Sequence, residues 1–323
     1  MRTRPGLLAA AVPLAAALLA SACSSSSSSS PAATGAAGGS PAAAGASVAK
    51  ITVIGAENEY ADVIAQVGGK YVQASSIMSN PNTDPHTFEA SPAVAREITG
   101  AKLVVQNGVG YDDWATTIEN ADPGDGRQVI NVQRLLGLPD NTANPHLWYK
   151  PTTMPVVANA VATNLGQIDP AHAAYYKANA ASFTASLGAW TKAMAAFKSA
   201  HPGVPVATTE PVADYMLQAA GADNLTPWTF QADIMNGTDP SPQDVATQKA
   251  LFTQHKVKVF LYNQQVADSL TESYIKLADE NGIPVVGVYE TMPTPGYTYQ
   301  SWMLAEVNAL NKAVTSKVST EKL

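Results

Sequence analysis

Two of the five histidines in this chain directly follow a proline, in Asp84-Pro85-His86 and in Asn144-Pro145-His146. Each proline fixes its own φ and restricts the residue before it, so each imidazole is held on a stiff piece of backbone. Asn, Asp, Pro and Ser surround His86, which indicates an exposed loop. A loop of this kind can hold a metal ligand. An ordinary loop histidine has the same local pattern, so neither motif decides the matter alone.

Two glutamates follow predicted strands in the second half of the chain. Glu210 comes after the apolar run 204–209, and Glu290 comes after the run 283–289. In open parallel sheets, ligands gather beyond the carboxyl ends of the strands. A carboxylate at that position can also be a simple helix cap. Taken with the two histidines, the two glutamates would complete a His2Glu2 set facing a cleft.

The chemistry of such a set indicates a divalent transition metal. Neutral imidazole suits borderline metals, whereas carboxylates add hard oxygen character. The set therefore excludes selection of Cu(I) and argues against an all-oxygen Ca²⁺ or Mg²⁺ site. Two carboxylates formally neutralise a divalent ion, which lowers the cost of burying it. Zinc binds more tightly than manganese to nearly any such site, so affinity alone does not identify the physiological ion. We favour Zn²⁺, with Mn²⁺ as the close alternative.

The amino terminus has the pattern of a secretion signal. Arg2 and Arg4 precede the apolar run 7–19, and small residues then lead to Cys23. The run is too short for a membrane span, and its flanks predict a signal peptide over residues 1–22. Cys23 is the only cysteine of the chain, which excludes an intramolecular disulfide.

The segment that follows the predicted signal is low in complexity. Residues 24–30 are all serine, and Pro, Ala and Gly dominate from there to about residue 47. Such a composition cannot bury a core, so residues 23–47 are expected to form a disordered tether.

The charge balance limits the classes of partner. The formal net charge is −7, and it becomes −9 when a cleaved signal removes Arg2 and Arg4. No basic run is present that could cover phosphates, so nucleic acid is not expected as a partner.

The rest of the chain predicts an α/β fold with two lobes. Short β-rich runs alternate with helical patterns over residues 48–166 and again over 203–323, which favours a mostly parallel sheet flanked by helices in each lobe. Between the lobes, residues 167–202 carry one apolar stripe and contain no internal proline after the first turn. A helix of this length extends roughly 45 Å, and we expect it to connect the two lobes. The stretch 226–241 is rich in Pro, Asp, Asn and Gly and predicts a long loop.

Several ordered motifs, from about residue 51 to residue 310, give the chain a family resemblance. It resembles the metal-binding lipoproteins of zinc and manganese ABC importers, the cluster A-I solute-binding proteins. The segments that carry the resemblance are DPHTFE at 84–89, LVVQNG at 103–108, NPHLW at 144–148, DPA at 169–171, TEP at 209–211, GIPVV at 282–286 and YQSWM at 299–303.

The resemblance implies two α/β lobes joined by one long helix, with the metal between the lobes. By position it implies that His86 and His146 are ligands from the first lobe. Glu210 occupies a place filled by His or Glu in different members, and Glu290 occupies a place filled by Asp or Glu. Many zinc-binding members also carry a His- and Asp-rich loop in the first lobe. Residues 120–143 contain aspartates but no histidine, so this marker of zinc is missing.

The resemblance also implies how the protein is anchored and what it works with. The residues before Cys23 are similar to a bacterial lipobox, which implies cleavage before this cysteine and attachment of lipid to it. The expected partners are the membrane, through that anchor, and the permease of an ABC metal importer. We expect an extracytoplasmic monomer, anchored to the cell membrane as a lipoprotein, that binds Zn²⁺ or Mn²⁺ as cargo and is not an enzyme.

Three other functions are compatible with parts of the sequence. A binding protein for an iron chelate or an organic solute would use aromatic residues in the cleft, such as Tyr111, Trp148 and Trp228. An extracytoplasmic zinc hydrolase would need an open metal position and a nearby base, and the chain has no His-Glu-x-x-His motif. A surface adhesin is the third, and it would not exclude metal binding.

Overall fold

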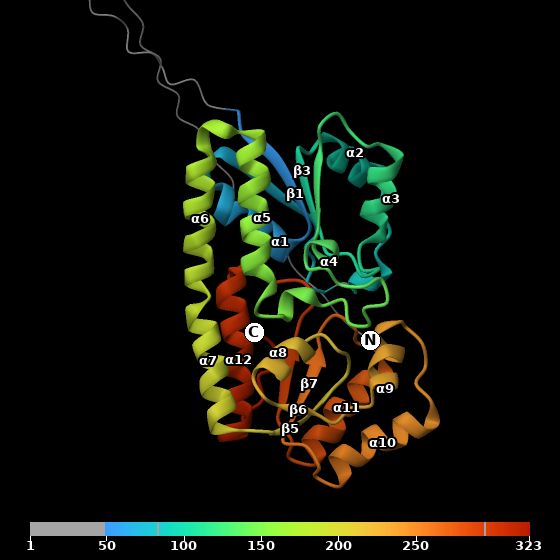
Figure 1. Cartoon of the computed structure of the whole chain (residues 1–323). Helices are drawn as coiled ribbons and strands as arrows, with labels where there is room; N and C mark the ends of the chain where they lie inside the picture. Colours follow the sequence, from blue (N-terminus) through green and yellow to red (C-terminus); the bar gives the residue numbers. More distant parts are fainter. Residues whose placement is uncertain (1–48, 83, 294) are drawn as a thin grey trace, which may run out of the picture. The chain divides into compact units, whose positions relative to one another are not determined.

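The computed structural model of the chain describes residues 49–82, 84–293 and 295–323 (Figure 1). The predicted signal peptide, the predicted tether and Cys23 lie outside the described residues. Within the described part of the chain, no helix combines the length and the apolar character that crossing a membrane requires.

The first lobe is built on a four-stranded parallel sheet with the order β2-β1-β3-β4. Because all neighbours run parallel, each connection crosses over the sheet and carries a helix. Helix α2 shows the local reason for a helix start, since Ser91 accepts a hydrogen bond from the Val94 N–H and Pro92 follows it at the first position. The strands are β1 (Ile51–Glu57), β2 (Val72–Met78), β3 (Leu103–Gln106) and β4 (Gln128–Asn131), and the helices are α1 (Asn58–Gly68), α2 (Pro92–Gly100), α3 (Asp113–Ala121), α4 (Val132–Leu135) and α5 (Thr153–Ile168).

The second lobe repeats this plan with the order β6-β5-β7-β8, again all parallel. The chain end adds to its edge, where Val286 forms a parallel bridge with Thr320. The strands are β5 (Pro205–Thr208), β6 (Asp223–Asn224), β7 (Val259–Asn263) and β8 (Val285–Val288), and the helices are α8 (Asp214–Ala219), α9 (Trp228–Met235), α10 (Pro242–Thr253), α11 (Ser269–Glu280) and α12 (Tyr299–Ser316). The predicted α/β fold with two parallel sheets flanked by helices is confirmed.

The expected connecting helix consists of three successive pieces. A short 3-10 helix, η4 (Pro170–His172), leads into α6 (Ala173–Ser186), and α7 (Gly188–Ala200) follows. The expectation of one continuous helix is corrected at Leu187, whose ψ of −6° departs from the value of about −42° in a regular α-helix. Figure 1 shows α6 and α7 as one column, with α5 and α1 packed on α6 and α12 packed on α7.

The two lobes share one hydrophobic core. A single cluster of buried side chains includes Val53 and Val105 from the first sheet and Val206 and Leu261 from the second. The column of α6 and α7 joins them, because Phe183 and Trp190 both pack on Tyr299 at the start of α12. A shared core holds the facing edges of the two sheets in a fixed relation.

The prediction of a long loop over 226–241 was wrong in its first half. Helix α9 occupies Trp228–Met235, and its Phe230 and Ile234 are buried in a second hydrophobic cluster of this lobe. These two residues stand four apart, which places them on one face of a helix. Burial of that face outweighs the turn-forming composition that surrounds the segment.

Candidate metal centre

His86 lies in a short 3-10 helix, η2 (Pro85–Thr87), beyond the end of β2. The carboxylate of Asp84 caps this helix by accepting a hydrogen bond of 2.8 Å from the His86 N–H. Pro85 is buried and fixes the first helical position. The two preceding residues therefore fix the backbone of His86, while its side chain keeps 19 % of its surface exposed.

His146 is held more tightly and is completely buried. The Oδ1 atom of Asn144 accepts from the His146 N–H at 2.9 Å and lies 2.8 Å from the ring Nδ1. An amide oxygen can only accept, so Nδ1 carries the proton and Nε2 keeps its lone pair. Asn144 also donates 2.7 Å to the carbonyl of Pro211, the residue after Glu210.

Glu290 brings the two histidines together. It lies two residues beyond β8, and its Oε2 is 3.1 Å from His86 Nε2 and 3.3 Å from His146 Nε2. The ligand atoms of these three residues all lie within 4.8 Å of one another. The His86 contact lacks hydrogen-bond geometry, so His86 Nε2 has no hydrogen-bond partner among the described residues. Both nitrogens and the carboxylate oxygen thus converge on one small volume.

Glu210 lies beyond the end of β5 and reaches the same centre through Asn263. The Nδ2 atom of Asn263 donates 3.1 Å to Glu210 Oε1 and 2.7 Å to Glu290 Oε1. The other oxygen, Glu210 Oε2, is buried and has no partner in the described part of the chain. Glu210 is not part of the compact group of three, so the structure places it next to that group and not inside it.

The charges around the centre shift the pKa values in opposite directions. Burial would lower the pKa of His86, but the carboxylates of Glu290 and Asp84 together outweigh burial and raise it. For His146, which is buried completely, burial outweighs the carboxylate of Glu290 and the pKa falls. Burial would raise the pKa of Glu290, and the two histidines instead hold it below its usual range. Burial and then the charge of Glu290 raise the pKa of Glu210.

These shifts reflect burial and the charges within the centre. Burial is the main reason that the pKa of Glu210 is raised, and the charge of Glu290 adds to it, so a second negative charge at Glu210 is unfavourable. A divalent cation would balance it and would also need both imidazoles neutral. The two histidines and two glutamates are therefore suited to a divalent ion in charge, and the structure brings three of them, His86, His146 and Glu290, close together.

Tyr111 and Asn263 are the site residues that the sequence analysis did not place. The Tyr111 hydroxyl donates 2.9 Å to Glu290 Oε2, whereas the sequence suggested this ring only as a wall for an organic solute. Asn263 ends β7, and the rule that strand ends collect ligands, which indicated the two glutamates, could have indicated it as well.

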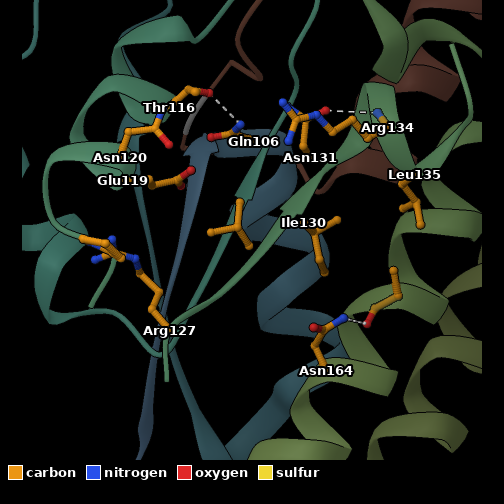
Figure 2. A pocket seen from close by; sticks show the side chains of 13 residues that line it. Gln106, Thr116, Glu119, Asn120, Arg127, Ile130, Asn131, Arg134, Leu135 and Asn164 are labelled. Atoms are coloured by element: carbon orange, nitrogen blue, oxygen red, sulfur yellow. Dashed lines mark hydrogen bonds between the residues drawn. The ribbon is translucent and has the colours of Figure 1, made fainter. Parts of the chain in front are cut away.

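The centre is nearly closed to solvent. His86 borders an open cavity of about 320 Å³, which is also lined by Tyr111 and by Trp228 from α9. A separate cavity of about 620 Å³ lies in the first lobe between α3, β4 and α5 (Figure 2). Gln106, Glu119 and Asn131 line this second cavity, and none of the four candidate ligands does.

A known protein family matches most of the chain. The model of one protein family, described as zinc-uptake complex component A, periplasmic (ZnuA), matches residues 53–313. The chain belongs to the ZnuA family. The matched range contains both Pro-His motifs, both glutamates and the whole connecting column.

Two relatives whose names state different metals have the same sequence identity to the chain. The manganese-binding lipoprotein MntA of Bacillus subtilis is 22% identical over 288 residues, which cover 82% of this chain and 90% of MntA. The iron-binding protein YfeA of Yersinia pestis is 22% identical over 251 residues, 73% of this chain and 78% of YfeA.

Solved structures share the fold. A crystal structure of ZnuA has a TM-score of 0.67 at 19% identity and covers 82% of this chain and 100% of its own. The solute-binding protein FpvC of Pseudomonas aeruginosa, in complex with Mn²⁺, has a TM-score of 0.68 at 21% identity and covers 83% of this chain and 99% of its own. The family is one of metal-binding proteins of ABC importers, and its description names zinc uptake. The names of MntA and YfeA state manganese and iron for those two proteins.

Proposed function

We propose that this chain captures one divalent transition metal ion outside the cytoplasm and delivers it to an ABC importer. One observation carries the proposal: the Nε2 atoms of His86 and His146 converge on Glu290 Oε2 in a buried site. Two imidazole nitrogens and a carboxylate oxygen at this spacing form a set of metal ligands once the rings are neutral.

The fourth ligand we propose is Glu210. Its Oε2 is buried without a partner among the residues described, which is costly unless a cation or a proton occupies the neighbouring space. Two carboxylates also neutralise a divalent ion, so that the ion can be buried at low cost. Zn²⁺ and Mn²⁺ are the two ions we consider.

The arrangement favours capture over chemistry. A hydrolytic metal keeps an open position for water and needs a base beside it. Here the carboxylate that contacts both histidines is the proposed ligand Glu290, and the Tyr111 hydroxyl is already bound to it. We therefore propose a binding protein with no enzymatic step.

The proposed setting is the outer face of the cell membrane. MntA carries the name of a lipoprotein, and a relative from Streptococcus cristatus is named a metal ABC transporter substrate-binding lipoprotein. Together with the lipobox-like sequence before Cys23, these names support a lipid anchor and a permease as partner. We also propose that the chain acts as a monomer.

A binding site for an organic solute is the second candidate, because the cavity beside His86 is lined by Tyr111 and Trp228. Elemental analysis of protein purified without chelators or added metals separates the two. We expect about one equivalent of zinc or manganese per chain. A chain that carries no transition metal, or iron together with an organic chelator, would contradict the proposal.

A further inference from the structure

We propose that Asn263 restricts the centre to four ligand atoms and thereby selects zinc over manganese. The inference rests on the proposed function, since it concerns which ion the same four side chains prefer.

Asn263 contacts both carboxylates with one side-chain group. It ends β7, and in the sheet order β6-β5-β7-β8 this strand lies between the strands that lead to Glu210 and Glu290. Its Nδ2 donates to Oε1 of each glutamate, at 3.1 Å and 2.7 Å. Since an amide nitrogen has two hydrogens, one hydrogen serves each carboxylate.

The amide cannot turn away easily. Asn263 is completely buried, and its Oδ1 accepts a hydrogen bond of 3.0 Å from the Gln265 N–H. Its backbone N–H donates 3.0 Å to the hydroxyl of Thr209, the residue before Glu210. The side-chain oxygen and the backbone nitrogen are both engaged, so the Nδ2 group is directed at the carboxylates.

As a result, each glutamate presents one oxygen to the metal. The Oε1 atoms are both bound to Asn263, which leaves Glu210 Oε2 without a partner in the described chain and Glu290 Oε2 facing the histidines. Tyr111 donates to that same Glu290 oxygen, and a carboxylate oxygen with several lone-pair sites can accept this bond while it binds a cation.

Two imidazole nitrogens and two single carboxylate oxygens make four ligand atoms. Zinc in protein sites takes four ligands in a tetrahedron. Manganese prefers a larger, oxygen-rich shell, which these glutamates could supply only if they bound through both oxygens. To bind through both oxygens, each glutamate would have to turn its Oε1 toward the ion and away from the Nδ2 hydrogens of Asn263. That turn would leave buried N–H groups unpaired, so the amide acts against manganese and not against zinc.

The test compares the dissociation constants for Zn²⁺ and Mn²⁺ in the wild-type chain and in Asn263→Ala, each measured by competition calorimetry. Outer hydrogen-bond partners of metal ligands change affinity by about 10- to 100-fold. We expect the preference for zinc to fall by about tenfold or more in Asn263→Ala, because the carboxylates become free to bind through both oxygens. An unchanged ratio overturns the inference.

Asn224→Ala is the matched control. Asn224 also donates to a carboxylate in the second lobe, at 2.9 Å from Asp214 Oδ1, but it contacts none of the proposed ligands. We expect it to leave the metal ratio unchanged, and an equal change in both variants would overturn the assignment to Asn263. A wild-type chain that binds neither ion would instead refute the proposed function.

X-ray absorption at the zinc and manganese edges gives a second readout on the wild-type chain and needs no variant. We expect four nitrogen and oxygen ligands around zinc, with both carboxylates bound through one oxygen. Glutamates bound through both oxygens in the wild-type zinc complex would contradict the inference.

Discussion

The Oδ1 atom of Asn144 lies 2.8 Å from Nδ1 of His146 and also accepts from the backbone N–H of the same histidine. One side chain thus fixes the backbone, the ring orientation and the protonated nitrogen of a proposed ligand. It also ties the first lobe to the second through the Pro211 carbonyl. The Asn-Pro-His motif is therefore a unit in which the first residue orients the third.

Asn144→Ala should weaken metal binding without unfolding the chain. The variant removes the acceptor that keeps the Nδ1 proton in place, and loss of such an outer partner costs about 10- to 100-fold in metal affinity. Competition calorimetry with Zn²⁺ measures the change. Asn159→Ala is the control, because that amide donates only within its own helix, to the Pro155 carbonyl. Equal affinities in Asn144→Ala and the wild type would refute the positioning role.

His86→Ala and His146→Ala should each lose more affinity than Asn144→Ala, since each removes a proposed ligand and not its support. We expect losses above about 100-fold, the upper range for an outer partner. Far-UV circular dichroism should show that both variants stay folded. His201→Ala serves as the control at the end of α7, where the ring packs on Phe197. Affinity that survives in both ligand variants would remove these histidines from the site.

Metal binding should weaken as the pH falls, because each imidazole must lose its proton before it can bind. The raised pKa of His86 means that protons begin to compete above its usual value of 6.5, whereas His146, with its lowered pKa, stays neutral further into acid. Titrations with Zn²⁺ between pH 8 and pH 5 test this. An affinity that stays constant over that range would contradict the proposed ligands.

The metal-free chain should show an additional pH effect through Glu306 in α12. Burial raises the pKa of this carboxyl to about 8, although Trp302 and Tyr149 donate to it. An acid whose pKa is raised by folding stabilises the folded state below its unfolded pKa, and that contribution is lost as the pH rises through the folded pKa.

Between pH 4.5 and 8 the free energy of unfolding should therefore fall by up to about 1.4 kcal/mol per pH unit on account of Glu306. Glu306→Gln keeps an acceptor for both donors and removes the charge, so its stability should depend less on pH. Urea unfolding of metal-free protein at pH 5 and pH 8 measures the slope. If the free energy of unfolding changes equally with pH in the variant and in the wild type, Glu306 does not titrate in this range.

Asn58→Ala should destabilise the contact between the lobes. The side chain of Asn58, at the start of α1, donates 2.8 Å to the Met292 carbonyl and accepts 2.9 Å from the Met292 N–H. Its removal leaves two backbone groups of the second lobe buried and unpaired, which should cost roughly 2–3 kcal/mol. Asn236→Ala, which removes an exposed amide at the end of α9, should cost less than about 0.5 kcal/mol in the same urea titration. A similar cost for both variants would show that the Asn58 pair adds no stability.

The features that could be predicted from the sequence are those that depend on residues close together in the chain. Proline before His86 and His146 indicated stiff loops, and the alternation of strands and helices indicated two parallel sheets. The roles of Asn263 and Tyr111 depend on the order of strands in space, since β7 contacts Glu210 and Glu290 only because it lies between β5 and β8. Sequence order alone does not contain that arrangement. Helix α9 was missed because the burial of Phe230 and Ile234 outweighs a composition typical of loops.

The most direct test of the proposed capture site is a calorimetric titration of Zn²⁺ into metal-free wild-type protein at pH 7.5, with His146→Ala alongside. We expect one ion to bind per wild-type chain and the binding heat to be lost, or the affinity to fall by more than about 100-fold, in the variant. Tight binding of one ion with the same affinity in both proteins, or no binding to the wild type, would contradict a metal centre built on His86, His146, Glu210 and Glu290.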